Sequence, residues 1–335
     1  MKRYSRHLLL EEMGRSGQQK LQQARVLVVG AGGLGCPALQ YLAAAGVGHI
    51  GIIDGDEVDE SNLQRQILFS PHDVGKKKAE IAKRQLLHQN PLITVAAYPF
   101  LLDEKNATDL IAAYDLVLDG CDNFTTRYLV NDACVITGKP FVSGAVFKFE
   151  GQLSVFNYRN GPTYRCLYPE PGDIATCSEV GVLATLTGII GTMMATEAIK
   201  IISEKGLVLS GKLLVADALS MNFNQFEFES NPANQKISTL GPSLSSNCSI
   251  PFEITKDQLN LLNDYLLVDV RSAEEFVLNN NGGINIPLAT LLDKTDELPH
   301  DKPIICSCRS GIQSVVAVQF LKEVGFQNAF SLKKN

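Results

Sequence analysis

The stretch from Arg25 to Asp54 constrains the fold of this chain more than any other part of the sequence. Its apolar run Val26–Val29 is short and rich in β-branched residues, which predicts a buried parallel strand. The turn GAGGLG at 30–35 leads into Cys36–Ala45, whose composition favours a helix. His49–Asp54 then predicts a second strand that ends on a carboxylate. This order of strand, glycine turn, helix, strand and acid predicts a nucleotide-binding βαβ unit.

The glycines of the turn lack side chains and therefore allow the backbone to approach a phosphate group, whose charge the helix N-terminus stabilises. They are Gly30, Gly32, Gly33 and Gly35. Asp54 follows the last of them by about 20 residues, a spacing that suits an acceptor for ribose hydroxyls. We predict a bound nucleotide, and the motif alone leaves its identity open.

Length and composition indicate a globular protein of two domains. The sequence has 335 residues, of which 45% are hydrophobic and 20% charged, enough for a sizeable core. A net charge of −6 without a basic stripe argues against a nucleic-acid binder. The most apolar stretch, Val180–Ile202, contains Glu197 and Lys200 and does not predict a membrane span. Eight cysteines without a signal-peptide core indicate free thiols, and we expect a cytoplasmic protein.

Charged side chains after the ribose acid indicate a triphosphate. Acids cluster at 54–60, directly after a strand, where open α/β sheets bind ligands. Arg65 and Lys78 follow them. A dehydrogenase seldom needs two such cations there, whereas an enzyme that handles a triphosphate must neutralise the phosphate charge. The alternative, a solvated basic helix end, is our interpretation of Lys76–Lys77.

A second group of candidate ligands follows the strand predicted at Tyr114–Gly120. Asp119 and Asp122 lie at its carboxyl end, where carboxylates beside a nucleotide are natural Mg²⁺ ligands. The alternative is that one of the two only caps the helix predicted at Asn123–Ile136. The other elements predicted in this region are strands at Leu92–Tyr98 and Pro140–Ala145 and a hairpin at Phe147–Tyr158.

Two cysteines lie where a reactive thiol would be useful. Cys177 lies in the polar loop Gly161–Val180 and is either a nucleophile or an ordinary loop cysteine. Cys308 follows a strand at Pro303–Cys306 and precedes a short loop and a helix, whose N–H groups and dipole would favour a thiolate or persulfide anion. A buried structural cysteine would have the same pattern. We expect Cys36, Cys134 and Cys306 in the core.

A polar segment divides the chain. Residues 231–251 are rich in Pro, Ser and Asn, which indicates a linker and a domain boundary. The apolar helix predicted at Gly181–Ile202 before it indicates burial or a subunit contact. The segment after it has a strand of its own at Tyr265–Val270.

The motifs, taken together and in order, resemble those of a known family. GAGGLGCPA (30–38), IIDGDEVDESNLQRQ (52–66), VGKKKAE (74–80), LDGCDNFTTR (118–127) and TCSEVGVL (176–183) resemble the MoeB/ThiF group of ubiquitin-activating-type adenylyltransferases. LVDVRSAEEF (267–276), INIPL (284–288) and CRSGIQS (308–314) resemble a rhodanese domain. The resemblance implies an α/β fold, with a Rossmann-like mixed or parallel sheet and helices on both faces, followed by a small α/β rhodanese-like domain. We expect the adenylyltransferase domain at 1–232, a linker at 233–250 and the rhodanese-like domain at 251–335.

The resemblance implies that ATP, with Mg²⁺, occupies the glycine turn. The substrate would be a small ubiquitin-fold sulfur-carrier protein of the MoaD or ThiS type, which ends in Gly-Gly and serves molybdopterin or thiamine biosynthesis. Its terminal carboxylate would attack the α-phosphate, release pyrophosphate and form an acyl-adenylate. The positions that match the family imply that Gly33 lies against the phosphates, Asp54 holds the ribose, Arg65 and Lys78 neutralise phosphate charge and Asp122 binds Mg²⁺. The matching motifs add Asp56, Asn62, Gln66 and Asn123 to the expected nucleotide site.

Three further roles come from the resemblance. By itself Arg6 is a solvated surface charge, but it corresponds to an arginine that reaches the triphosphate from the other subunit of a homodimer. Cys177 matches a loop cysteine that forms a covalent link to the carrier. Cys308 would bear the persulfide that converts the adenylate into a thiocarboxylate, loaded by a persulfide donor such as a cysteine desulfurase.

The sequence departs from the family pattern at three places. Members often hold zinc with two CxxC pairs, but here the first pair reads Thr163-Tyr164-Arg165-Cys166 and residues 205–240 contain no cysteine, so we expect no structural zinc. Gln313 stands where rhodanese loops usually carry a second arginine. The chain stops at Asn335, where such domains often continue. Sulfur transfer is therefore a weaker expectation than adenylylation.

Two alternatives stay open from the sequence. One is a nicotinamide-dependent oxidoreductase on the same βαβ unit, against which Arg65, Lys78 and Asp122 argue. The other is a non-catalytic rhodanese-like scaffold fused to an adenylyltransferase.

Overall fold

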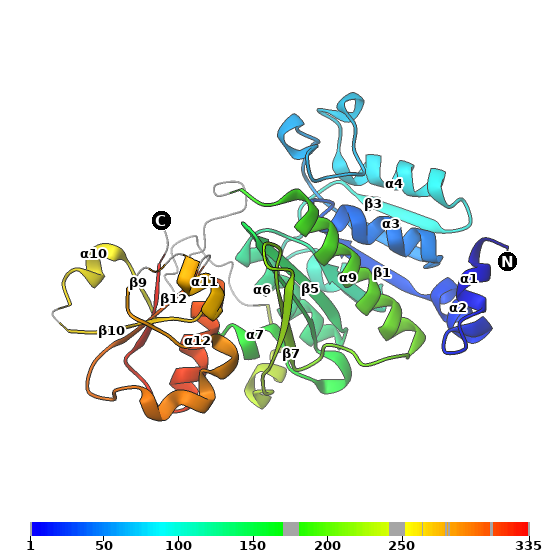
Figure 1. Cartoon of the computed structure of the whole chain (residues 1–335). Helices are drawn as coiled ribbons and strands as arrows, with labels where there is room; N and C mark the ends of the chain where they lie inside the picture. Colours follow the sequence, from blue (N-terminus) through cyan, green and yellow to red (C-terminus); the bar gives the residue numbers. More distant parts are fainter. Residues whose placement is uncertain are drawn as a thin grey trace. The chain divides into compact units, whose positions relative to one another are not determined.

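A computed structural model describes residues 2–169, 181–240, 252–262, 264–278, 280, 282–308 and 311–333. The chain forms two compact units, 1–247 and 248–335 (Figure 1).

The first unit is built on an eight-stranded sheet. Its strand order is β3-β2-β1-β4-β5-β6-β7-β8, parallel from β3 to β5 and antiparallel from β5 to β8. The strands are β1 (Arg25–Val29), β2 (His49–Ile53), β3 (Thr94–Tyr98), β4 (Leu116–Asp119), β5 (Phe141–Phe147), β6 (Glu150–Phe156), β7 (Lys212–Asp217) and β8 (Asn222–Glu227). The central strands β1 and β4 are almost wholly buried, which explains their uninterrupted apolar sequences.

Helices cover both faces of this sheet (Figure 1). They are α1 (Ser5–Leu8), α2 (Gly14–Gln23), α3 (Gly35–Ala45), α4 (Lys78–Gln89), α5 (Ala107–Ala112), α6 (Phe124–Thr137), α7 (Tyr164–Leu167) and α9 (Ala184–Ser203), with short 3₁₀ helices η1 (Lys2–Tyr4), η2 (Glu60–Asn62), η3 (Pro71–Asp73), η4 (Tyr158–Asn160) and η5 (Pro232–Gln235). α3 packs against α4 and α9, whereas α6 packs against α5 and α7. Because the chain leaves β1 and β4 in opposite directions along the sheet, right-handed crossovers put α3 and α6 on opposite faces.

The strand order of the first sheet reverses between β1 and β4. The chain continues from β1 to β2 on one side and from β4 to β5 on the other. The loops after these two strands therefore diverge, which creates the crevice where open α/β sheets bind ligands. Gly30 and Gly120 meet at this point, because the N–H of Gly120 donates to the carbonyl of Val29 at 2.9 Å and a Cβ on Gly30 would lie 3.1 Å from the carbonyl oxygen of Gly120.

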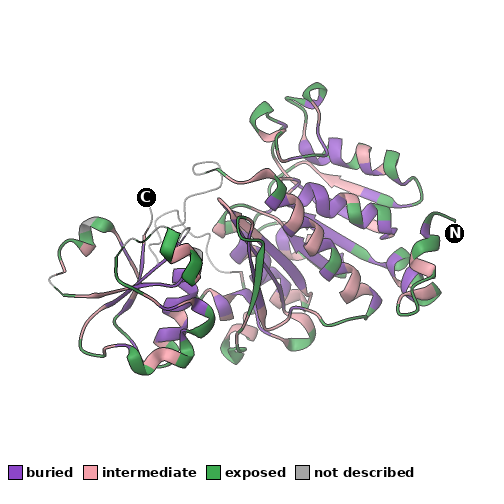
Figure 2. Ribbon diagram, viewed as in Figure 1, coloured by how far each residue is buried: buried purple, intermediate pink, exposed green. Residues whose placement is uncertain are grey.

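α9 is the one helix in the described part of the chain that is long and apolar enough to cross a membrane by length and composition. It is nevertheless part of the core, since Leu186, Ile190 and Met194 are fully buried against the sheet (Figure 2). Gly151 of β6 provides the room, because a Cβ there would lie 2.5 Å from Ile190.

The second unit has a parallel sheet of its own. Its strands are β9 (Glu253–Ile254), β10 (Leu266–Asp269), β11 (Ile284–Asn285), β12 (Ile304–Ser307) and β13 (Ala329–Leu332), in the order β11-β10-β12-β13-β9. The helices are α10 (Lys256–Leu259), α11 (Ala273–Leu278), α12 (Ile312–Glu323), η6 (Leu288–Thr290) and η7 (Leu292–Glu297). Here the strand order reverses between β10 and β12, so the second sheet also has a switch point.

The fold expected from the sequence is confirmed, but the hairpin predicted within Phe147–Tyr158 is wrong. β5 extends to Phe147 and pairs antiparallel with β6, and the turn is made by Lys148 and Phe149. Gly151, which marked the expected turn, lies instead within β6, where the packing of Ile190 requires a residue without a side chain.

Candidate functional site

The glycine turn follows β1 at the switch point and leads into α3. Gly30 has φ +89°, a conformation that favours glycine, and a Cβ on Gly35 would lie 1.9 Å from the carbonyl oxygen of Gly30. Thr187 of α9 closes the other side, since a Cβ on Gly33 would lie 3.1 Å from its Cγ2. The turn thus has the tight backbone that a phosphate-binding turn requires.

Asp54, Asp56 and Lys78 gather beside this turn. The carboxylate of Asp54 accepts hydrogen bonds from the N–H groups of Ala31 at 2.7 Å and Asp56 at 2.9 Å. Burial raises the pKa of Asp54, and the nearby charge of Lys78 opposes this rise. The side chain of Lys78 is buried, and its Nζ lies 3.0 Å from Oδ2 of the exposed Asp56. A buried ammonium beside a phosphate-binding turn can neutralise the charge of an anionic ligand.

Gln66 lies at the edge of the turn. It is 5% exposed, its Nε2 lies 3.8 Å from the position of a Cβ on Gly32, and its buried Oε1 has no hydrogen-bond partner among the residues that the structure describes. Arg65 and Asn62 are half-buried nearby in sequence: Nη1 of Arg65 donates to the carbonyl of Ser61 at 3.1 Å. A buried amide oxygen without a partner indicates a ligand that would complete its hydrogen bonds.

The polar residues after β4 divide into structural and exposed groups. Asp119 is fully buried and accepts from the Oγ of Ser143 at 2.9 Å. Asn123 is the N-cap of α6, since its Oδ1 accepts from the N–H of Thr126 at 2.8 Å. The alternative that an aspartate caps this helix is therefore wrong. Asp122 is exposed at the carboxyl end of β4, so its carboxylate is accessible to a cation.

Arg127 is a further component of this region that the sequence alone did not indicate. It is 9% exposed, and its Nη2 donates to the carbonyls of Cys121 at 2.7 Å and Gly144 at 3.1 Å. Burial lowers the pKa of Arg127, but its interactions with Asp119, Cys121 and Tyr164 together outweigh this effect and raise the pKa. Arg127 belongs to the motif LDGCDNFTTR, yet only the fold shows that its charge is buried beneath the end of β4.

Arg6 lies at the opposite end of α3 from the glycine turn. The hydroxyl of Tyr4, two residues before Arg6 in the chain, accepts a hydrogen bond from Nδ2 of Asn90 at 2.9 Å. A Cβ on Gly46, the C-cap of α3, would lie 2.5 Å from the ring of Tyr4. α3 has 11 residues and is therefore about 16 Å long, so the exposed Arg6 is a helix length from the turn of its own chain.

The cysteines differ in their surroundings. Cys36, Cys134 and Cys306 are fully buried, as expected, and burial raises the pKa of Cys36 to about 12. Of the loop predicted at Gly161–Val180, residues 161–169 are described and contain the short helix α7, whereas Cys177 lies outside the described residues.

Cys166 lies where two distant segments of the first unit meet. Its sulfur accepts from the N–H groups of Thr163 at 3.4 Å and Asn231 at 3.3 Å, and from Nδ2 of Asn234 at 3.6 Å. The hydroxyl of Thr163 also lies 3.4 Å from the sulfur. Burial raises the pKa of Cys166, but these hydrogen bonds lower it overall. Residues 163 and 166 are three positions apart, as are residues 231 and 234, and the thiol of Cys166 joins the two pairs. The helix η5, at the start of the predicted linker, is part of this contact.

Within the described ranges, no three His, Cys, Asp or Glu side chains gather as a metal site.

Cys308 follows β12 at the switch point of the second sheet. Its sulfur accepts from the N–H groups of Gly311 at 3.1 Å and Ser314 at 3.4 Å, and it lies 3.4 Å from the Oγ of Ser314. Gly311 is the N-cap of α12, so the helix N-terminus points at the sulfur. This arrangement favours a sulfur anion, as predicted. Arg309 and Ser310 lie outside the described residues, as do residues 334 and 335.

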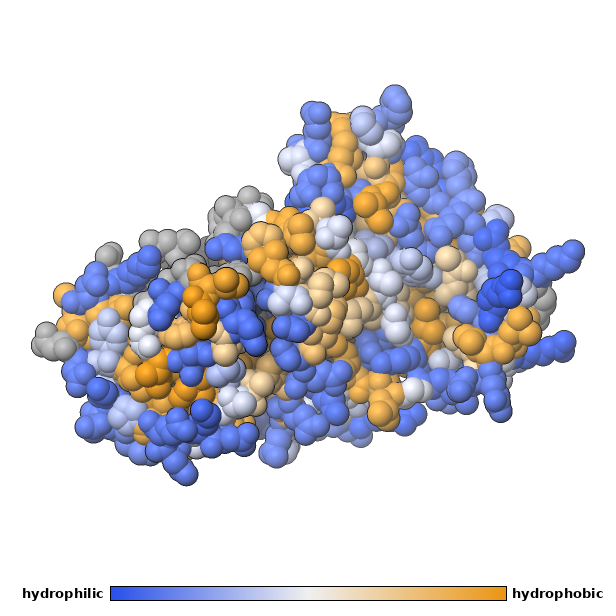
Figure 3. All heavy atoms as spheres, viewed as in Figure 1, coloured by the Kyte–Doolittle hydropathy of each residue, from blue (hydrophilic) through white to orange (hydrophobic). Residues whose placement is uncertain are grey.

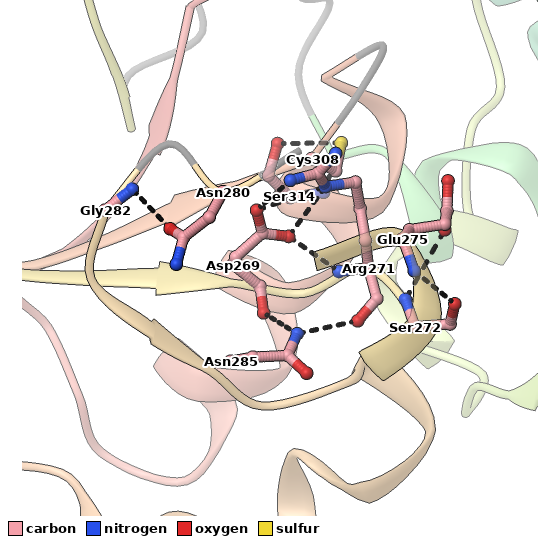
Figure 4. A network of polar contacts seen from close by, with 9 residues as sticks. All are labelled: Asp269, Arg271, Ser272, Glu275, Asn280, Gly282, Asn285, Cys308 and Ser314. Atoms are coloured by element: carbon pink, nitrogen blue, oxygen red, sulfur yellow. Dashed lines mark hydrogen bonds and ion pairs between the residues drawn. The ribbon is translucent and has the colours of Figure 1, made fainter. Parts of the chain in front are cut away.

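Asp269 and Arg271, at the end of β10, form a buried ion pair beside this cysteine (Figure 4). Nε of Arg271 donates to Oδ1 of Asp269 at 2.9 Å and Nη2 donates to Oδ2 at 2.5 Å. Both residues belong to the motif LVDVRSAEEF, whose sequence alone indicates no role for them. Gln313, by contrast, has a buried Oε1 with no partner among the described residues.

The first site fits ATP on the evidence of its own residues. The turn excludes side chains at two positions, Lys78 provides a buried cation, Asp54 an oriented acceptor and Gln66 an unpartnered amide oxygen. Together with the strand order, these features define a nucleotide-binding protein of the Rossmann-like α/β class.

Comparison with known proteins identifies the family. The ThiF family matches residues 4–238, and the rhodanese-like domain matches residues 255–334. The chain belongs to the ThiF family and carries a rhodanese-like domain after it.

Three named relatives are similar over most of the chain. "Probable adenylyltransferase/sulfurtransferase MoeZ" of Mycobacterium tuberculosis (strain ATCC 25618 / H37Rv) is 42% identical over 356 residues, which cover 99% of this chain and 90% of the relative. "Adenylyltransferase and sulfurtransferase MOCS3" of Drosophila yakuba is 42% identical, covering 96% of this chain and 78% of the relative. "Probable molybdopterin-synthase adenylyltransferase" of Porphyra purpurea is 41% identical, covering 97% and 89%.

Solved structures of E. coli MccB have a similar fold. The microcin C7 biosynthetic enzyme MccB in complex with N-formylated MccA has a TM-score of 0.61 and 25% identity, covering 71% of this chain and 75% of that chain. E. coli MccB with ATP has a TM-score of 0.60 and 21% identity, covering 69% and 75%.

Proposed function

We propose that the first unit uses ATP to adenylylate the C-terminal Gly-Gly carboxylate of a small ubiquitin-fold sulfur-carrier protein, and that the second unit delivers sulfur to it. The observation that carries this proposal is the convergence of Lys78, Asp54 and the glycine turn at the switch point of a ThiF-family sheet. The chain is an enzyme, a nucleotidyltransferase with a sulfurtransferase domain, like the relatives that bear these names. The relative named for molybdopterin synthase favours a MoaD-type carrier over a ThiS-type carrier.

The residues of the first site divide the work of binding ATP. Asp54 accepts from the ribose, Lys78 and Arg65 neutralise the phosphates, and the turn N–H groups approach them. ATP supplies the α-phosphate that the carrier carboxylate attacks. Since the chemistry is positioning and charge neutralisation, loss of one charged side chain is expected to lower the rate by roughly 10²–10³-fold.

Mg²⁺ is the second ligand that we propose for this site. Asp122 is exposed at the end of β4, and carboxylate oxygens are suitable ligands for this ion. Asn123 is committed to capping α6, so its amide is the weaker candidate.

A homodimer explains the position of Arg6. Tyr4 places this segment at the C-terminal end of α3, a helix about 16 Å long that begins at the glycine turn, and we propose that Arg6 reaches the triphosphate of a second copy. α9 offers an apolar surface for this contact: Ile189 and Met193 remain half-buried, and Figure 3 shows apolar side chains along this part of the first unit.

Sulfur transfer would use Cys308, with a cysteine desulfurase as the persulfide donor. The two N–H groups that donate to its sulfur support an anionic persulfide. Cys177 is proposed as the residue that links to the carrier, and we propose the cytoplasm as the compartment, where thiols stay reduced.

The test is carrier-dependent ATP–pyrophosphate exchange with MoaD-like and ThiS-like proteins that have intact Gly-Gly tails. We expect exchange with one carrier, and Arg65→Ala and Asp122→Ala should each lower it by roughly 10²–10³-fold. Lys76→Ala is the matched control, because this lysine is exposed and contacts the carbonyl of His72 at 2.6 Å. Full exchange in both site variants would contradict the residue roles, and no exchange with either carrier would contradict the reaction.

A further inference from the structure

The buried ion pair of the second unit has no role in the function proposed so far. Asp269 is 1% exposed and Arg271 is 4% exposed, and three hydrogen bonds join the carboxylate to the guanidinium. Burying two charges is costly, and an apolar pair of similar size often stabilises a fold as well or better. The position of the pair therefore requires a reason besides stability.

The pair lies at the switch point, next to the reactive cysteine. Asp269 is the last residue of β10 and pairs in register with Ser307, the residue before Cys308. Nδ2 of Asn285 donates to the carbonyls of both Asp269 and Arg271 at 2.9 Å, which fixes the backbone between them. Figure 4 shows the guanidinium of Arg271 pointing toward the corner formed by Cys308 and Ser314, with Asp269 on its other side.

The hydrogen bonds described on the sulfur of Cys308 come from neutral groups. The N–H groups of Gly311 and Ser314 donate to it, and Oγ of Ser314 lies 3.4 Å away. Among the described residues, Arg271 and Cys306 interact electrostatically with Cys308, and Asp269 and Glu275 interact with Arg271. Arg271 is the cation among these four.

We propose that Arg271 is the electrostatic partner of the Cys308 sulfur anion, and that Asp269 is a positioning residue that holds the guanidinium in place. The proposal rests on the proposed sulfur transfer and assigns a residue to it.

The order of the charges explains the effect. The sulfur meets the guanidinium first and the carboxylate behind it, so the attraction to the nearer cation exceeds the repulsion from the farther anion. Hydrogen bonding to Asp269 raises the pKa of Arg271, and Cys308 contributes in the same direction, so the guanidinium stays charged. Burial of the site keeps water from screening the interaction.

The test measures the ionisation of Cys308 in the full chain. The ¹³Cβ chemical shift of labelled cysteine is recorded as a function of pH. This shift reports thiolate formation without requiring a reagent to reach the buried sulfur, and Cys308→Ser assigns the resonance. Arg271→Gln should raise the midpoint pH by about one unit or more. Asp269→Asn leaves the guanidinium and removes the opposing charge, so it should lower the midpoint.

The opposite signs distinguish electrostatics from loosening of the fold. A shift in the same direction in both variants, or no shift in Arg271→Gln, would overturn the proposal. Arg271→Gln leaves Asp269 buried without its partner and can fail to fold. In that case Arg271→Gln combined with Asp269→Asn replaces the ion pair by two amides, and a raised midpoint is again expected. Arg271→Lys keeps the charge and should restore most of the wild-type midpoint.

Failure of the proposed function would look different. If the unchanged chain, incubated with inorganic polysulfide, gains no persulfide on Cys308 by mass spectrometry, sulfur transfer fails. The midpoint pH still tests Arg271 by itself, because thiolate formation does not require turnover.

Discussion

Two backbone N–H groups donate to Asp54, so the turn itself orients this carboxylate toward the crevice. The N–H of Ala31 belongs to the glycine turn and that of Asp56 to the loop that pairs with Lys78. Asp54 therefore links the conformation of the turn to the position of the buried ammonium group of Lys78. At the scale of one residue, the hydrogen bonds that fix the turn are the same ones that orient the carboxylate proposed to bind the ligand.

Asp54→Asn should weaken ATP binding by about tenfold or more, because a charged hydrogen bond to the ribose is lost. Calorimetric titration with ATP and with 2′,3′-dideoxy-ATP measures this. The wild type should prefer ATP, and the variant should bind both nucleotides with similar affinity. A variant that keeps the wild-type preference would show that Asp54 does not hold the ribose.

The same residue predicts a pH dependence. Burial raises the pKa of Asp54 despite the charge of Lys78, so ATP affinity should fall with acid at a pH above the ordinary range of aspartate. The folded state then binds this proton more tightly than the unfolded chain, so the contribution of Asp54 to stability is complete below the unfolded pKa and is lost as pH rises through the folded one. Acid should thus release ATP without unfolding the unit through this group. Titrations from about pH 4 to about pH 7 should show this step in the wild type and not in Asp54→Asn.

At the scale of elements, one sulfur atom joins α7 to η5. Thr163 and Cys166 belong to the first segment and Asn231 and Asn234 to the second, and the donors of both converge on the thiol. The protein's own hydrogen bonds thus close a junction between segments that are far apart in sequence.

Cys166→Val should lower the free energy of unfolding of the first unit by about 1–3 kcal/mol, because partly buried donors lose their acceptor. Cys166→Ser is the matched control, since its hydroxyl still accepts hydrogen bonds, and it should lose less. A chelator such as EDTA should leave the unfolding midpoint unchanged. A lower midpoint after chelation, with zinc released in proportion to protein, would contradict the metal-free junction.

Local elements could be predicted from the sequence and their long-range contacts could not. The strand, glycine turn and helix at 25–45 follow from periodicity and composition within a short window. The contacts of Thr187 with Gly33 and of Arg127 with the end of β4 join segments that have no shared pattern in the sequence. The same is true of the Asp269–Arg271 pair, whose residues were visible in a motif but whose burial depends on the strands around β10.

At the scale of the whole molecule, both units have a sheet whose strand order reverses. Each unit has its own sheet, and in each the candidate site follows the strands on either side of the reversal, β1 and β4 or β10 and β12. Arg6 is the exception, because only the family resemblance assigns it to the first site and its segment lies at the other end of α3.

Mixing two inactive variants tests the proposed dimer. Arg6→Ala and Lys78→Ala should each abolish most pyrophosphate exchange. If Arg6 acts on the partner's site, a mixed dimer has one site with both residues intact, so an equal mixture refolded or co-expressed should recover about a quarter of the wild-type rate. No recovery, with mixed dimers shown by native mass spectrometry, would mean that Arg6 serves its own chain or has no role.

The strand-order reversal in each sheet also bears on how such a protein can change over generations. The reactive side chains stand on loops beyond the strand ends, while the buried strands and helices carry the stability of each unit. A replacement such as Gln313, where rhodanese loops usually carry a second arginine, therefore alters the charge beside a site while the strands keep their packing. Lineages can gain, weaken or exchange a catalytic step in one unit while the other keeps its activity, and both keep their folds.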